Sequence, residues 1–206
     1  MVSETTVNLD QSAAILEKIA IAHQSGNKCD RPTPETVVEA MMALEKGSKK
    51  TRQTVTLPQL LGRWRLVFVT GTTKTRKKAG TAIGAGRYLP GLPNITIAYE
   101  EDNAHPNSTM GRAVNRVTLG AITLTVTGPI EAIANRSVMA FDFTQWSIAL
   151  GSWTAYRGEI GGGVASEGTF NEKSLKDRPF FNYFWVSETA ITARGKGGGL
   201  ALWVKV

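Results

Sequence analysis

The chain has 206 residues, 42% of them hydrophobic, and its 24 Lys and Arg residues against 17 Asp and Glu give a net charge of +7. This length favours one sizeable core with an appendage over two separate domains. A single cysteine, Cys29, excludes an intramolecular disulfide, and two histidines form no Cys/His cluster at metal-ligand spacing. We therefore expect no metal and no cofactor.

Residues 1–50 predict a helical hairpin. Over 8–26, apolar side chains recur near the 3.6-residue period, and Gly26 supplies a stop. In a second helix, Pro34 suits the first position and Gly47 marks the end. The polar stretch that follows ends in a proline, which is typical of a linker. The predicted organisation is a helical arm at 1–50, a linker at 51–59 and a β-barrel at 60–206.

Basic residues are concentrated in one segment. No acidic residue lies between Glu45 and Glu100, whereas eleven Lys and Arg residues do. This segment should meet an anionic partner, either a membrane surface or an acidic protein. No apolar run approaches the roughly 20 residues of a membrane span, so we expect a soluble or peripheral protein. The densest basic group is expected in a loop at one end of the barrel: Lys74, Arg76, Lys77 and Lys78.

The rest of the chain has the period of β-strands. In residues 122–127, Ile122, Leu124 and Val126 alternate with threonines, so the two kinds of side chain face opposite ways. Further strand candidates, separated by Gly, Pro and Asn, continue to the C-terminus. Eight or more short strands favour an up-and-down barrel, because full closure removes exposed strand edges. The sequence predicts a mainly β fold, an antiparallel β-barrel preceded by a helical hairpin.

Aromatic residues in the last third of the chain are the candidate lining of a binding site. A barrel of about eight strands is either filled by its own side chains or holds one small ligand, and the sequence leaves both outcomes open. Aromatic faces with polar tips suit a pocket for an apolar small molecule. The candidate ligand-binding residues are Trp146, Trp153, Tyr156, Tyr183 and Trp185.

Two segments carry a family resemblance. LLGRWRLVFVTGT (60–72) contains a Gly-x-Trp motif at Gly62 and Trp64, and ITARGKGGGLALWVKV (191–206) leads from Arg194 into a last apolar strand. With the ALE sequence at 43–45, they resemble the plastid-lipid-associated proteins, or plastid fibrillins, of cyanobacteria and plastids. The resemblance implies a lipocalin-like barrel in which Trp64 closes one end and Arg194 packs across its indole.

The same resemblance implies a function and a location. It predicts a peripheral protein on the cytoplasmic side of a thylakoid membrane, or in the plastid stroma, that carries a lipid, carotenoid or prenylquinone without catalysis. A structural or assembly subunit docked on a photosynthetic membrane complex is the alternative. A bilin lyase, which also uses a lipocalin-like barrel, resembles the chain less well because it lacks the helical arm.

Catalysis and nucleic-acid binding have little support in the sequence. His23 lies on a predicted helix and His105 in a turn-like polar segment, so no Ser/His/Asp or Cys/His arrangement is indicated. The basic segment could suggest a single-strand binder, but Trp64 belongs to the strand pattern and no glycine-aromatic RNA-binding signature is present. We expect neither an enzyme nor a nucleic-acid partner.

Overall fold

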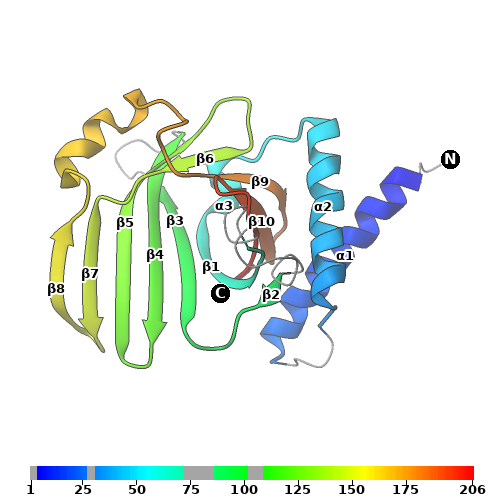
Figure 1. Ribbon diagram of the computed structural model, residues 1–206, viewed down its shortest axis with the longest axis horizontal. Coiled ribbons are helices and arrows are strands. Elements are labelled where there is room, and N and C mark those ends of the chain that lie inside the picture. The colour runs from blue at the N-terminus through cyan, green and yellow to red at the C-terminus, as the bar shows by residue number, and fades with distance from the viewer. Residues whose placement is uncertain (1–3, 27–30, 72–85, 102–108) are drawn as a thin grey trace.

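The computed structural model describes residues 4–26, 31–71, 86–101 and 109–206 (Figure 1). Two packed N-terminal helices precede a closed antiparallel barrel of eight strands, as the sequence predicts. The helices are α1 (Glu4–Gln24), α2 (Pro34–Thr51) and α3 (Leu57–Leu60), and η2 (Gly163–Glu172) is a 3₁₀ helix. Among these described helices, none combines the length and apolar character needed to cross a membrane.

The barrel closes in the order β1-β3-β4-β5-β6-β9-β10-β11, with β11 paired back to β1. The short strand β2 also pairs with β1. The bounds are β1 (Gly62–Val69), β2 (Arg87–Tyr88), β3 (Asn94–Glu101), β4 (Met110–Leu119), β5 (Ile122–Ala132), β6 (Val138–Phe141), β7 (Gln145–Leu150), β8 (Trp153–Glu159), β9 (Phe180–Val186), β10 (Ala190–Gly195) and β11 (Leu200–Lys205).

Strand β5 belongs to two structures at once. Its last residues pair with β6 inside the barrel, whereas Ile122–Thr127 pair with β7, which pairs in turn with β8. We call β7, β8 and the adjoining ends of β4 and β5 the wing, which projects on the left of Figure 1. The chain crosses from β6 to β7 over Gly128, where a Cβ atom would lie 2.1 Å from the carbonyl oxygen of Asp142. Glycine is required at this close approach.

The second helix is longer than the sequence predicts. Thr33 caps it and Pro34 begins it as expected, but α2 passes through Gly47 and ends at Thr51. The glycine serves packing instead of termination, because a Cβ atom at Gly47 would lie 2.6 Å from a methyl carbon of Leu9 on α1. Part of the predicted linker is also helical, since α3 starts at Leu57.

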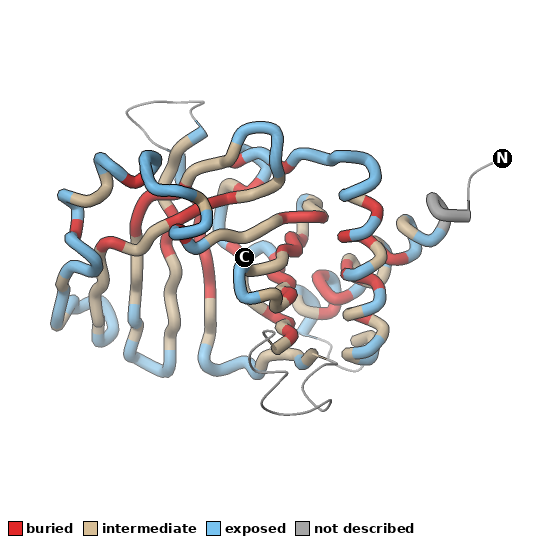
Figure 2. The backbone as a smooth tube through the Cα atoms, turned by 45° about the horizontal axis from the view of Figure 1, so that its top comes forward, coloured by how far each residue is buried: buried red, intermediate tan, exposed pale blue. Residues whose placement is uncertain are grey.

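The core consists of two apolar clusters. One fills the barrel interior, and the other lies between the helices and the outer face of β1, β9, β10 and β11. Figure 2 shows the buried residues in red on the helices and the barrel strands, while the ends of the wing strands are tan and blue. The interface between helices and barrel is closed by the buried residues Leu16, Met41, Phe68, Phe184 and Leu202.

A buried carboxylate fastens the helices to the barrel. Glu45 of α2 accepts hydrogen bonds from Nε and Nη2 of Arg194 on β10, at 2.9 and 2.5 Å. The third guanidinium nitrogen of Arg194 donates to the carbonyl of Gly198 at 2.6 Å. These hydrogen bonds hold the pKa of Glu45 below its usual value, so the group stays ionised.

Candidate ligand-binding site

The barrel interior is filled by aromatic rings. Phe181 stacks on Phe141 with ring centroids 5.1 Å apart and meets the edge of Trp203 at 5.4 Å. Tyr99 and Tyr183, both fully buried, cross at 6.3 Å in an edge-to-face arrangement. Offset and edge-to-face pairs of this kind stabilise a packed core beyond the area that they bury. The rings therefore occupy much of the space in which a barrel ligand would lie.

The two buried tyrosines satisfy each other. The hydroxyl groups of Tyr99 and Tyr183 share a hydrogen bond, and burial raises the pKa of both phenols above the ordinary value of 10. Both groups are therefore neutral at physiological pH, where each offers one donor and one acceptor. Their hydrogen bond removes the cost of placing two hydroxyl groups in an apolar interior.

The chain before β1 plugs one mouth of the barrel. In α3, Leu57 and Leu60 are buried and join the interior cluster. The indole Nε1 of Trp64 donates to the carbonyl of Leu60 at 2.6 Å, which ties the plug to the first strand. Gly62, between them, adopts a φ of +113°, a conformation that L-residues rarely take. The Gly-x-Trp segment therefore closes the barrel together with α3.

A pocket of about 320 Å³, which we call the mouth pocket, opens beside this plug. One wall is the segment before and within α3, and the other is the end of β5 with the turn that follows it. The hydroxyl of Ser137 joins the two walls, because it donates to the carbonyl of Gln53 at 2.7 Å and accepts from the amide of Val55 at 3.0 Å. The lining is mainly apolar and comprises Thr54, Val55, Thr56, Leu57, Pro58, Thr109, Ala132, Ile133, Ala134, Asn135 and Arg136.

This pocket borders the barrel interior. Val55 and Leu57 line the pocket and also belong to the interior aromatic cluster, against which Ala132 packs. The polar residues of the lining are three threonines, Asn135 and Arg136. A concave, mostly apolar site with a few polar groups is the usual form of a small-molecule site, and such sites occur at the mouths of barrels.

The structure does not bring the five predicted aromatic residues together. Tyr183 lies in the barrel interior, whereas Trp185 packs outside it against the cluster shared with the helices. Trp146 lies on β7 with its indole over Gly158, and Trp153 and Tyr156 lie on β8 with exposed rings. The expectation that all five line one barrel pocket is corrected by the branching of β5, which places β7 and β8 outside the barrel.

The predicted stacking of Arg194 on Trp64 is also corrected. The cation over the indole of Trp64 is Lys205 of β11, whose Nζ lies 5.3 Å from the ring centroid. Lys205 is the register partner of Trp64, so a cation of the last strand still packs on the tryptophan of the first strand. Arg194 is drawn away because all three of its hydrogen-bonding groups are engaged by Glu45 and Gly198.

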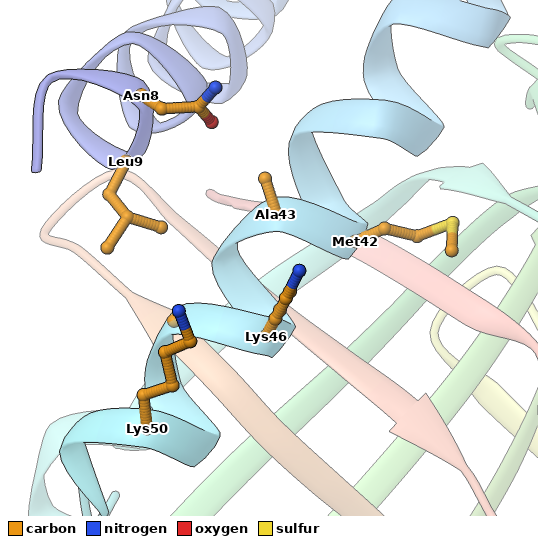
Figure 3. Close-up of a pocket in the computed structure, with 7 residues that line it drawn as sticks. Asn8, Leu9, Met42, Ala43, Lys46 and Lys50 are labelled. Atoms are coloured by element: carbon orange, nitrogen blue, oxygen red, sulfur yellow. The ribbon is translucent and has the colours of Figure 1, made fainter. Parts of the chain in front are cut away.

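The predicted basic group, Lys74, Arg76, Lys77 and Lys78, lies outside the described residues. A different basic site is visible between α1 and α2, where a pocket of about 520 Å³ is lined by Asn8, Leu9, Met42, Ala43, Lys46, Gly47 and Lys50. Figure 3 shows Leu9 reaching from α1 toward α2, and the two lysines one turn apart on α2. With two ammonium groups, this pocket suits an anionic group better than an apolar body.

Sequence reasoning missed the residues of the mouth pocket. Val55 and Leu57 lie in a stretch predicted as linker, because its polar residues and Pro58 outweighed the apolar ones. Their spacing was the available signal, since an apolar residue recurs at short intervals just before the first strand. The turn at 133–136 contains Asn135, which adopts a φ of +58°, a left-handed conformation that asparagine tolerates.

Comparison with protein-family models and with curated proteins finds no match for this chain. The resemblance to plastid-lipid-associated proteins therefore stays a prediction. The structure itself supports the coarser statement, that the chain forms a lipocalin-like barrel with a buried aromatic cluster, compatible with binding a small molecule.

Proposed function

We propose that this protein binds and carries an apolar small molecule, a lipid, carotenoid or prenylquinone, at the mouth of its barrel and without catalysis. The observation that carries the proposal is the apolar pocket beside α3, which shares Val55 and Leu57 with the barrel interior. In keeping with the family resemblance, we place the protein at the periphery of a thylakoid membrane.

The size of the pocket limits what it holds. About 320 Å³ lies at the lower end of the range for small-molecule sites. A ring or one end of a chain fits this volume, so a ligand as long as a carotenoid would lie partly outside it. A prenylquinone ring or a lipid chain with a polar end near Arg136 matches the lining best.

The test uses a lipid and pigment extract from a photosynthetic membrane. The purified protein is incubated with the extract, separated from it, and analysed by native mass spectrometry and absorbance. In the variant Ala134→Trp, an indole occupies the pocket from an exposed turn position. The control is Tyr156→Ala, which removes an exposed ring of the wing.

We expect one ligand per protein in the wild type and in the control, and loss of that ligand in Ala134→Trp. Equal binding by all three proteins would move the site away from the mouth. No binding by the wild type would overturn the proposal.

A second candidate function is a structural or assembly subunit of a photosynthetic membrane complex. It is favoured by the filled interior, where Phe141, Phe181, Tyr183 and Trp203 pack on one another. Recovery of the protein with such a complex after mild solubilisation, by the wild type and by Ala134→Trp alike, would support this function over carriage.

A further inference from the structure

Three turns meet at one end of the sheet formed by β3, β4, β5, β7 and β8, along the lower edge of Figure 1. They are the turn before β3, the β4–β5 turn and the β7–β8 turn. Each presents large apolar side chains to solvent. We call these five residues the apolar rim: Leu92, Leu119, Ile122, Leu150 and Trp153, which are 61%, 59%, 53%, 54% and 66% exposed.

Strand register places four members of the apolar rim in one row. Leu119 pairs with Ile122, Ile122 with Leu150, and Leu150 with Trp153. Directly paired residues have their side chains on the same face, about 5 Å apart. The row therefore runs across four strands at the tips of two adjacent hairpins. Scattered exposed apolar residues are ordinary on a protein surface, but a continuous row is not.

The charges around the apolar rim have one sign. The sequences of the three turns, 88–94, 118–123 and 149–154, contain no charged residue. Beyond them, the first charged residues on β2, β4 and β8 are Arg87, Arg116 and Arg157. Arg65 also reaches this end, where it donates to the carbonyl of Gly91 at 2.7 Å.

We propose that the apolar rim inserts into the interfacial region of an anionic lipid bilayer, with the arginines behind it facing the lipid phosphates. Trp and Leu at the tips of uncharged turns match the aromatic and apolar composition of the membrane interface. Arg116 and Arg157 pair through Thr125 and Ser147, so they lie on the sheet face opposite the row and a few residues behind the tips, where they reach the lipid phosphates once the tips insert. This inference deepens the membrane part of the proposed function and does not depend on a bound ligand.

The test is sedimentation with vesicles of phosphatidylcholine containing phosphatidylglycerol, and with vesicles of phosphatidylcholine alone. The variant Leu150→Ser/Trp153→Ser removes half of the row at exposed positions. The matched control is Val164→Ser, which removes an apolar side chain that is 48% exposed on η2. Circular dichroism and the midpoint of thermal unfolding establish that the variants are folded.

We expect the wild type and Val164→Ser to bind the anionic vesicles equally. The double variant should bind about tenfold less or weaker still, since burying one large apolar side chain alone changes a partition constant by about that factor. Arg116→Gln/Arg157→Gln should lose binding to the anionic vesicles only, and high salt should have the same effect.

A depth measurement adds an independent readout. Brominated lipid should quench part of the tryptophan fluorescence of the wild type, and Trp153→Phe should abolish that part. Equal vesicle binding by the wild type and the double variant would overturn the proposal. So would a wild-type dimer that the double variant converts to a monomer without any vesicle binding, because the apolar rim would then contact a second copy. Ligand binding in the mouth pocket, which is the proposed function, is tested separately by Ala134→Trp.

Discussion

Single buried residues fasten the helices to the barrel, and Glu45 is the clearest example. Its carboxylate lies in the interface and accepts two hydrogen bonds from Arg194. Glu45→Gln keeps the shape of the side chain but removes the charge. We expect the free energy of unfolding at neutral pH to fall by about 1–3 kcal/mol, as for other charged hydrogen bonds. Urea denaturation measures this change, and a variant as stable as the wild type would contradict it.

The contribution of Glu45 also depends on pH. Hydrogen bonds from Arg194 hold its folded pKa below the usual value of 4.5. For a lowered carboxyl pKa, the stabilisation is complete above the unfolded pKa and is lost as the pH falls through the folded pKa. The stability difference between the wild type and Glu45→Gln should therefore be constant near neutral pH and shrink below about pH 4.5. Urea denaturation at a series of pH values tests the trend, and a constant difference down to the acid limit would contradict it.

The tyrosine pair in the barrel makes a second prediction at this scale. Tyr183→Phe leaves the hydroxyl of Tyr99 buried without its partner, so we expect a loss of about 1–3 kcal/mol. Tyr99→Phe/Tyr183→Phe removes both hydroxyl groups and should cost less than the sum of the single variants. A double-mutant cycle by urea denaturation measures the coupling, and strictly additive effects would show that the hydroxyls do not depend on each other.

At the scale of elements, β5 determines where the barrel ends and the wing begins. Gly128→Ala would place a methyl group 2.1 Å from the backbone oxygen of Asp142, and backbone cannot yield as a side chain can. We expect a loss of at least about 3 kcal/mol, or failure to fold. Gly91→Ala is the matched control, because a Cβ atom there meets nothing within 4 Å. Its effect should stay within about 0.5 kcal/mol. Equal stability of the two variants would contradict the close-approach argument.

The same strand shows what the sequence could and could not predict. The alternation of Ile122, Leu124 and Val126 with threonines was sufficient to predict a two-faced strand, and the structure confirms it. Periodicity is local, however, and does not say which strands become partners. The branching at Gly128 depends on a backbone contact between distant segments, so Trp153 and Tyr156 could be assigned to strands but not placed outside the barrel.

The candidate site, too, could be predicted only in part from local sequence patterns. The Gly-x-Trp motif predicted closure of one barrel end, and Trp64 does lie at that end. The cation over its indole is another residue, because Arg194 is held by a carboxylate on a helix 149 positions away in the sequence. Pairings over such separations cannot be read from local patterns. Apolar residues within a polar stretch, such as Val55 and Leu57, become core residues only when the barrel mouth forms around them, so their role could not be predicted from the sequence.

At the scale of the whole molecule, the helical arm and the barrel share one apolar cluster. Leu16, Met41 and Leu44 of the helices pack with Phe68 and Leu202 of the barrel strands. Without the helices, the outer face of β1, β9, β10 and β11 would present a large apolar patch to water, and such patches promote association. We therefore expect neither part to be stable without the other.

We expect the full chain to unfold in a single transition. Helical circular dichroism reports on α1 and α2, whereas tryptophan fluorescence reports on the strands of the barrel and the wing, which hold all five tryptophans, and both signals should change at the same urea concentration. A chain that begins at residue 53 should aggregate or fail to fold cooperatively, because it lacks Glu45 as well as the helical half of the shared cluster. Two separate midpoints, or a monomeric barrel that unfolds cooperatively without the arm, would show that the barrel core alone is sufficient and that the helices are an accessory.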